Sequence, residues 1–419
     1  MKRICPLLVT TISLVFVSIA GSSADTTDAK WQTKAIVEKK GAHCVDDPNC
    51  FNRYHPAIPH VKRAKPSDMI VFHTRDALDS DLNLTSNADD LAAVDLNLVH
   101  PMTGPVHIEG AKRGDVLAVT LVDIAPDEYG YTVIVPGFGF LRDLFPDPYI
   151  VNWKLDHQAA VSNQMPGVRV PMAAFMGSVG VLPGEPEVEA WLARETKLGE
   201  VGGVALPPQP VGALPADVCG PEGSHKETCL RTIPPRENGG NMDVQQMQVG
   251  TTLLLPCFVD GCGLFVGDVH YAQGDGEVSG TAIEMGATVT VVTEVLKGKG
   301  SDITSPHFEG EDQLKDIAPE NFYATLGFPL KAEGEVPAFL TYLDGERIAG
   351  LENLSEDLTL AARAALIEMI KYLVREHGLT REQAYVLCSV AVDLVVGQVV
   401  DVPNYTVSAV LDLEVFAKE

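Results

Sequence analysis

The chain has few basic residues and lacks the motifs of several common enzyme classes. Its 419 residues include 31 Lys and Arg against 57 Asp and Glu, which gives a formal net charge of −26 at pH 7. Nucleic-acid binding needs a basic surface, so no nucleic-acid partner is expected. The sequence contains no H-E-x-x-H or C-x-x-C zinc motif and no G-x-G-x-x-G dinucleotide fingerprint. Ser178 lacks the first glycine of a G-x-S-x-G elbow, so a serine nucleophile is not indicated.

Long apolar runs are also missing, except at the N-terminus. Lys2 and Arg3 precede an apolar run over residues 6–20, and small residues follow at 22–24. The run is shorter than the span of about 20 residues that crosses a bilayer. Residues 1–24 are therefore interpreted as a secretory signal peptide. A secreted or periplasmic protein without a membrane span is expected, and loss of the two basic residues with no acidic one moves the net charge from −26 to −28.

Cysteines are few, and their spacing is informative in an oxidising compartment. Seven remain after the leader, and local disulfides are predicted between Cys44 and Cys50 and between Cys219 and Cys229. Connectivity cannot be read from sequence alone. For the other three, Cys257, Cys262 and Cys388, two interpretations stay open: a bridge between the first two, or free thiols that pack as small apolar side chains.

The stretch from residue 238 to 284 holds most of the candidate chemistry. The apolar run 262–266 predicts a β-strand, and Asp268 and His270 follow it directly. Strand side chains alternate between the two faces of a sheet. If the strand continues through residue 270, the carboxylate and the imidazole lie on the same face, spaced to bind one ion. The alternative is that these residues belong to a solvated acidic turn.

A glycine-rich turn follows this predicted strand. Gly274 and Gly276 can adopt positive φ angles, so the turn can bring Asp275 and Glu277 back toward the same face. A histidine with two or three carboxylates suits zinc or a harder divalent ion such as calcium. The residues alone leave two interpretations open: a divalent metal site, with zinc as the first candidate and calcium as the second, and a solvated acidic turn.

A second glycine turn precedes this block. Gly239, Gly240 and Asn241 are followed closely by Asp243. Successive backbone N–H groups in such a turn form a concave site that suits a developing oxyanion. The alternative is a loop that needs glycine only for its dihedral angles. A similar choice exists for the aromatic and glycine-rich stretch 133–145, which is either an apolar rim for a small substrate or ordinary loop packing.

Three separated motifs resemble the acetamidase/formamidase family of amidohydrolases. They are NLVHPMTGPVHIEGAKRGDVLAV at 97–119, NGGNMD at 238–243 and GDVHYAQGDGEVSGTAIE at 267–284. Several motifs in the right order are more specific than any one of them. The resemblance covers roughly residues 60 to 300 and, more faintly, the C-terminal region. It implies hydrolysis of a short carboxamide to a carboxylate and ammonia by a homo-oligomer with a bound divalent metal.

The resemblance also implies a mainly β fold, like a β-sandwich or barrel. Residues 25–60 are expected to form a disulfide-bearing lead-in, 61–300 a β-rich catalytic core with an insertion at 183–237, and 301–419 a smaller α+β section. Two helices are predicted in that last section. Ser355 is expected to cap the helix 356–376, which Gly378 ends, and Thr380 with Gln383 predicts a capping box for the next helix.

Roles follow for the candidate residues if the family chemistry applies. Asp268, His270 and Glu277 would bind the metal, and Glu284 or Asp243 would act as general base. The second glycine turn with its asparagine would hold the carboxamide oxygen. Two alternatives remain: a non-catalytic secreted β-rich protein that binds a metal such as calcium or another ligand, and a hydrolase of a larger amide or lactam. Asp76 stands where the family has an acidic residue, so it could also reach the site.

Overall fold

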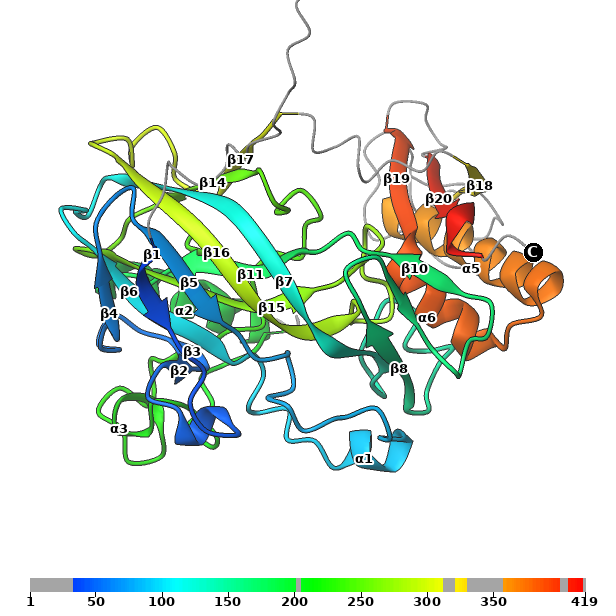
Figure 1. Ribbon diagram of the computed structural model, residues 1–419, viewed down its shortest axis with the longest axis horizontal. Coiled ribbons are helices and arrows are strands. Elements are labelled where there is room, and N and C mark those ends of the chain that lie inside the picture. Colours follow the sequence, from blue (N-terminus) through cyan, green and yellow to red (C-terminus); the bar gives the residue numbers. More distant parts are fainter. Residues whose placement is uncertain (1–32, 201–204, 312–320, 330–356, 400–405, 417–419) are drawn as a thin grey trace, which may run out of the picture.

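The computed structural model describes residues 33–200, 205–311, 321–329, 357–399 and 406–416, and this part of the chain is mainly β (Figure 1). The strands of the larger part are β1 (Thr33–Val37), β2 (Cys50–Phe51), β3 (Arg53–Tyr54), β4 (Lys62–Ala64), β5 (Met69–His73), β6 (Met102–Ile108), β7 (Val116–Ile134), β8 (Tyr149–Leu155), β9 (Ala159–Val161), β10 (Arg169–Pro171), β11 (Phe175–Val181), β12 (Leu230–Arg231), β13 (Gly239–Asn241), β14 (Thr252–Pro256), β15 (Cys262–His270), β16 (Glu284–Leu296) and β17 (His307–Glu309). The C-terminal strands are β18 (Phe322–Gly327), β19 (Val392–Gln398) and β20 (Thr406–Asp412). The helices are α1 (Ala88–Ala92), α2 (Glu185–Glu200), α3 (Ala216–Cys219), α5 (Leu358–His377) and α6 (Arg381–Ala391), with 3-10 turns η1 (Cys44–Asp46) and η3 (Leu413–Val415).

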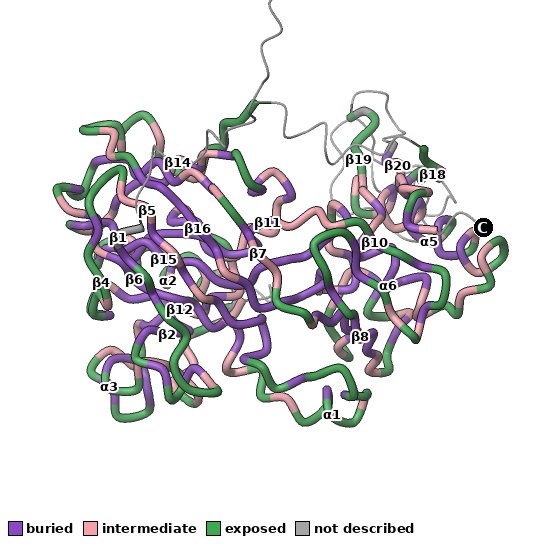
Figure 2. The backbone as a smooth tube through the Cα atoms, viewed as in Figure 1, coloured by how far each residue is buried: buried purple, intermediate pink, exposed green. Residues whose placement is uncertain are grey.

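A branched sheet of 15 strands forms the body of the described chain. Its main path runs β10-β9-β8-β7-β16-β15-β11-β13, and β5 and β6 join it at β16 and β15. The long strands β7 and β16 cross the middle of the molecule side by side (Figure 1). The centre of β16 is rich in β-branched residues, as predicted, because such side chains pack well on a pleated and buried surface. Figure 2 shows that the central strands are buried while the loops around α1 and α3 are exposed.

The C-terminal part is a three-stranded sheet, β18-β20-β19, with α5 and α6 packed beside it. The capping box of Thr380 and Gln383 is confirmed, and Gly378 ends α5 in a left-handed conformation as predicted. The cap of α5 is a correction. The side chain of Asp357 accepts hydrogen bonds from two backbone N–H groups of the first turn, so this residue replaces Ser355, which lies outside the described residues.

Three disulfides occur in the described part of the chain: Cys44–Cys50, Cys219–Cys229 and Cys257–Cys262. The first two are those predicted from spacing, and the third decides between the two interpretations left open. Cys388 is buried with a free thiol. The predicted signal peptide lies outside the described residues. None of the described helices is long and apolar enough to cross a membrane.

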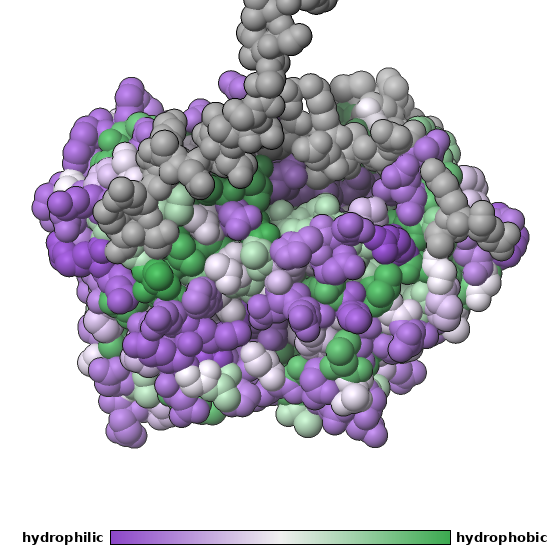
Figure 3. Space-filling model, in the orientation of Figure 1, coloured by the Kyte–Doolittle hydropathy of each residue, from purple (hydrophilic) through white to green (hydrophobic). Residues whose placement is uncertain are grey.

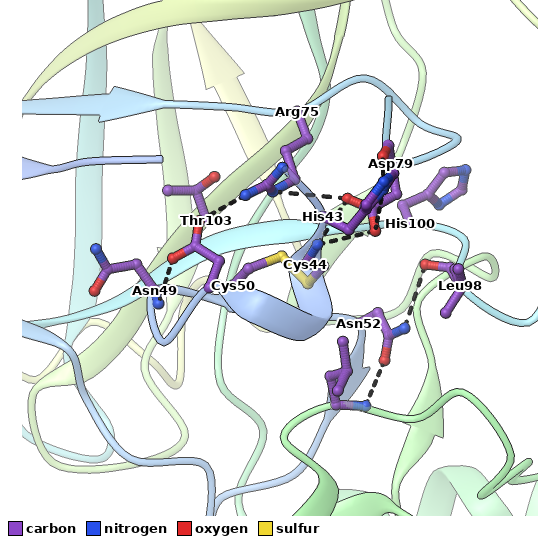
Figure 4. Close-up of a disulfide and its surroundings, with 12 residues drawn as sticks. His43, Cys44, Asn49, Cys50, Asn52, Arg75, Asp79, Leu98, His100 and Thr103 are labelled. Atoms are coloured by element: carbon purple, nitrogen blue, oxygen red, sulfur yellow. Dashed lines mark hydrogen bonds and ion pairs between the residues drawn. A yellow bond between two sulfur atoms is a disulfide. The ribbon is translucent and has the colours of Figure 1, made fainter. Parts of the chain in front are cut away.

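The first disulfide is tied to the loops that follow β5 and precede β6 (Figure 4). The backbone N–H of Cys44 donates to both carboxylate oxygens of Asp79 at 2.9 Å, and the Arg75 guanidinium lies 3.7 Å from the same carboxylate. The Asn52 side chain donates to the carbonyl of Leu98 at 3.3 Å. The lead-in thus braces two loops that, as described below, line a cavity.

The face in Figure 3 carries several separate groups of apolar residues, surrounded by hydrophilic ones.

Candidate active site

The sharpest sequence motif lies at the point where β15 and β16 meet. β15 extends through Asp268 to His270, and His270 pairs in register with Glu284, the first residue of β16. The Nε2 atom of His270 lies 3.5 Å from a carboxylate oxygen of Asp268 and 3.5 Å from one of Glu284. All three side chains are at most 3% exposed. The predicted proximity of Asp268 and His270 is therefore confirmed, and the sheet register adds Glu284.

Two loop residues complete this cluster. Asp243 follows β13, and Glu277 lies in the turn between β15 and β16. Ligand atoms of Asp243, Asp268 and His270 lie within 4.8 Å of one another, and so do those of His270, Glu277 and Glu284. Asp243, Asp268 and Glu277 have positive φ angles of 51°, 51° and 43°. Such strained backbone in non-glycine residues is concentrated at functional sites.

Burial and mutual repulsion dominate the electrostatics of the cluster. Burial raises the pKa of Asp243 and of Glu284 well above the ordinary values, and it raises the pKa of Glu277 to about 7. Burial disfavours the charged form of His270, but Glu284 and Asp268 outweigh it and raise the pKa of the imidazole. Burial opposes ionisation of Asp268 too, but neighbouring histidines keep its pKa low. Four carboxyl groups, of which Asp268 and Glu284 belong to fully buried residues, thus lie around one imidazole.

Several polar atoms of this cluster have no hydrogen-bond partner although they are buried. They are Oδ1 of Asp243, both ring nitrogens of His270 and Oε2 of Glu284. The other oxygen of Glu284 accepts the backbone N–H of Ala282 at 2.9 Å, which fixes the carboxylate. Buried polar groups are normally satisfied, so a group of unpartnered ones makes this cluster a candidate ligand site. Acceptors of this type, carboxylate oxygens and imidazole nitrogens, are those that bind a divalent metal.

Strand β11 forms the support behind the cluster. It lies in the stretch 168–182, which resembles the segment that lines the cleft in the family. The hydroxyl of Ser178 lies 3.0 Å from Oδ1 of Asn241 and 3.3 Å from Oδ2 of Asp268. Phe175 pairs with His270 and holds its ring edge to face at 5.1 Å. Because Ser178 occupies Oδ1 of Asn241, the amide NH₂ of that side chain is left to donate. No local motif marks Ser178, since its role depends on the pairing of β11 with β13 and β15.

A cavity of about 410 Å³ opens onto the cluster. Asp243, Asp268, Glu277 and Glu284 line it together with Asn241. Apolar side chains from the loops around the site make up much of the rest of the lining. The cavity has the size and mixed polarity of a small-molecule site.

His100 also lines the cavity, and sequence reasoning did not single it out. Its Nδ1 is buried without a partner, while its backbone N–H donates to the hydroxyl of Thr232 at 2.7 Å. Burial lowers the pKa of this imidazole. The only signal in the sequence was its place within the stretch 97–119 that carries the family resemblance. The aromatic and glycine-rich stretch 133–145 reaches the cavity through Phe138 and its neighbours.

Not every candidate reaches the cavity. Gly239 and Gly240 are buried and do not belong to its lining, and the N–H of Gly239 donates to the carbonyl of Arg236 at 3.0 Å. Asp275 was expected in the cluster, but it lies elsewhere. Its backbone N–H donates to the carboxylate of Asp393 on β19 at 2.9 Å. Asp76 accepts the hydroxyl of Tyr131 at 2.8 Å instead of lining the cavity.

The C-terminal helix α6 holds the loop that carries Glu277. Ser389 on this helix donates to the carbonyl of Thr281 at 2.7 Å and accepts the N–H of Ser279 at 3.0 Å. Its own carbonyl accepts the N–H of Gly274 at 2.9 Å. The smaller α+β section is thus part of the structure that positions the site.

A buried imidazole surrounded by carboxylates beside a cavity, on a mainly β scaffold, is typical of a hydrolase that works with a metal or by general acid–base chemistry. The model of the Acetamidase/Formamidase family matches residues 37–418. The chain is 32% identical to an acetamidase of Mycolicibacterium smegmatis over 361 residues, which cover 80% of this chain and 84% of that protein. It is 28% identical to a formamidase of Methylophilus methylotrophus over 391 residues, 88% and 90% of the two chains.

Among solved structures, the fold is similar to that of a gamma lactamase from Delftia acidovorans. The TM-score is 0.81 at 30% sequence identity, and the match covers 92% of this chain and 94% of that one. The chain therefore belongs to the acetamidase/formamidase family and is an amide-cleaving hydrolase.

Proposed function

We propose that this protein hydrolyses a small carboxamide to a carboxylate and ammonia with the help of a bound divalent ion. The observation that carries the proposal is the group of buried polar atoms without hydrogen-bond partners on Asp243, His270 and Glu284 beside the cavity. Formamide and acetamide, the substrates expected from the sequence, are the simplest amides of this kind.

The residues of the cluster fit a zinc ion better than calcium. Zinc accepts imidazole nitrogen and carboxylate oxygen at a four-coordinate site, whereas calcium takes six to eight oxygen ligands. Asp268, His270 and Glu277 are assigned to hold the ion. Ligand atoms of Asp268 and His270 lie close together with one of Asp243, and those of His270 and Glu277 lie close together with one of Glu284. A bound zinc ion would polarise the amide carbonyl and lower the pKa of a water molecule.

The remaining residues bind the amide and move protons. Glu284 has one oxygen fixed by Ala282, and the other lies 3.5 Å from the His270 ring without a hydrogen bond. A cation bound beside it would favour the carboxylate form, which can take a proton from the attacking water. That oxygen then delivers the proton to nitrogen as the C–N bond breaks, which releases ammonia and the carboxylate. Asp243 is the alternative base. The side-chain NH₂ of Asn241, oriented by Ser178, is placed to donate to the carbonyl oxygen.

Hydrolysis of a lactam is a second candidate. It is supported by the similarity to the gamma lactamase structure over 92% of this chain. The same base and the same amide donor would serve, but the nitrogen would stay attached to the product as an amine. The two candidates therefore differ in whether free ammonia appears.

We further propose that the protein acts outside the cytoplasm. Three disulfides in the described chain support this, because disulfides persist in oxidising compartments and are rare in the cytosol. Mass spectrometry of the mature protein tests the proposal by locating the N-terminus after residue 24 and the bridged cysteines.

The test of function is ammonia release by purified, zinc-loaded protein from formamide, acetamide and larger amides, with and without chelator. Glu284→Gln and Asp268→Asn should each lose at least about 100-fold in kcat/KM. Glu294→Gln is the matched control, because Glu294 lies on the same strand but is exposed. A lactam panel, read by appearance of an amine, tests the second candidate. Bound metal with no turnover in either panel would refute both proposed substrate classes.

A further inference from the structure

The cavity at the site is larger than formamide or acetamide, the simplest amide substrates. A water molecule takes about 30 Å³ of liquid volume, so acetamide, with its four non-hydrogen atoms, would fill roughly a quarter of a cavity of about 410 Å³. Once the carboxamide sits beside Asn241 and Glu284, most of the cavity is left to the acyl group. What lines that remaining space therefore decides which acyl group binds best.

That lining is apolar and comes from loops far apart in the sequence. Its large members are Leu78, Leu96, Val99, Val135, Phe138 and Ile233, called here the apolar wall. Phe138 is 52% exposed and Leu96 is 45% exposed. Apolar side chains exposed around a pocket commonly mark a ligand contact.

Phe138 forms one side of the apolar wall. An added Cβ at Gly280 would lie 2.5 Å from the Phe138 ring, so the ring packs directly on that glycine. The N–H of Phe138 donates to the carbonyl of Val135 at 3.0 Å, and Phe140 bonds to Val278 at 2.8 Å. The backbone around Phe138 is thus fixed by hydrogen bonds, and one edge of its ring lies against Gly280.

The insertion 183–237 holds the other side. Ile233 belongs to it and lines the cavity. Its neighbour Thr232 donates its hydroxyl to the carbonyl of Val99 at 3.1 Å, and Arg231 donates to the carbonyl of Leu96 at 3.1 Å. The insertion therefore adds one apolar side chain and fixes the loop that carries two more.

The lead-in supplies a further brace for the same loop. The guanidinium of Arg53 is fully buried and donates to the carbonyls of Asn97 at 3.1 Å and of Gln209 at 2.8 Å. It links the loop before β6 to the insertion. Preorganised pocket walls cost less ordering on binding, so contacts with them translate into selectivity.

We infer that the preferred substrates are carboxamides whose acyl carbon carries a compact apolar group of ring size, bound against the apolar wall. The inference rests on the proposed amide hydrolysis and specifies its substrate class. The carboxamide lies at the acidic cluster, and the hydrocarbon ring fills the space between Phe138 and Ile233. Residues of the insertion determine this specificity without taking part in the chemistry.

The test compares acetamide, benzamide, cyclohexanecarboxamide and oxane-4-carboxamide with zinc-loaded full-length protein. The last two rings are matched in size, but one contains an ether oxygen. A methylene group in an apolar pocket is worth about tenfold in kcat/KM. We expect cyclohexanecarboxamide to exceed acetamide by about 100-fold and the ether analogue by about tenfold.

Variants locate the preference on the wall. Phe138→Ala and Ile233→Ala should each lower the ratio of kcat/KM for cyclohexanecarboxamide over acetamide by about tenfold. Val211→Ala and Phe322→Ala are the controls, since both residues are exposed apolar side chains outside the cavity lining, and they should leave the ratio unchanged. Wild-type preference for acetamide, or a ratio that the wall variants do not change, would overturn the inference.

Calorimetry of the same amides separates this inference from the proposed function. Tighter binding of cyclohexanecarboxamide than of acetamide, lost in the wall variants, supports the apolar wall even if no amide is hydrolysed. Hydrolysis without any wall dependence leaves the proposed function standing and removes the inference. Equal binding of all four amides in the absence of turnover also refutes it.

Discussion

Substitution of Gly177 by alanine should damage the site through a single methyl group. Gly177 lies on β11, opposite the Asp268 region of β15. A Cβ at this position would stand 2.5 Å from the carbonyl oxygen of Asp268 and 2.6 Å from Nε2 of His270. Gly177 has no positive φ angle that would itself exclude alanine. The effect of the substitution is therefore steric and directed at the residues assigned to the metal.

The distances set the size of the effect. Carbon atoms in contact prefer a separation of about 3.5 Å or more, so the imidazole of His270 or the strand that carries Asp268 must move by about 1 Å. A displacement of about 1 Å at a reacting centre costs on the order of 100-fold in rate. Overpacking of a buried position costs about 1–3 kcal/mol of unfolding free energy. Gly177→Ala should thus fold and lose about 100-fold in kcat/KM.

The assay combines urea unfolding, zinc content and amide turnover per folded molecule. Gly223→Ala is the matched control, because its Cβ would meet the carbonyl oxygen of Val218 at 2.5 Å, in the loop closed by the Cys219–Cys229 disulfide and outside the cavity lining. It should lose similar stability and keep its kcat/KM. Turnover of Gly177→Ala within twofold of wild type, with the same zinc content, would show that the packing of His270 against β11 does not limit the site.

Three other substitutions test separate parts of the structure. Ser178→Ala should raise KM about fivefold and change kcat less, because the lost hydrogen bond frees the Asn241 side chain that holds the amide. Burial lowers the pKa of His55 from 6.5 to about 4, so the unfolded chain takes up a proton that the fold excludes. Stability should therefore fall as the pH drops from 6.5 toward 4, by at most about 3 kcal/mol, and urea titrations of His55→Asn should lose this dependence. Ser389→Ala should reduce the unfolding free energy by about 1–3 kcal/mol, measured by urea titration. It should also lower turnover, because the loop carrying Glu277 loses the two hydrogen bonds made by the Ser389 hydroxyl.

Local patterns predicted much of the secondary structure and one pair of the site. β-branched runs predicted β16, and the alternation of a strand predicted that Asp268 and His270 share a face, which holds at 3.5 Å. The capping box at Thr380 depends only on residues within one helical turn, so the sequence was enough to predict it. Close cysteine spacing predicted two disulfides for the same reason. The cap of α5 was wrong by two positions, because several neighbouring residues can cap a helix equally well.

Contacts between distant segments decided the rest. Glu284 faces His270 because β15 and β16 pair at that register, and Ser178 supports the cluster because β11 pairs with two other strands. Asp275 was expected in the cluster but bonds to Asp393, more than 100 residues away. The sequence alone therefore determined which groups were available, since residue type and local periodicity are local properties. Only tertiary structure decided which of them meet in one cavity and that an apolar wall, assembled from four separate loops, stands beside them.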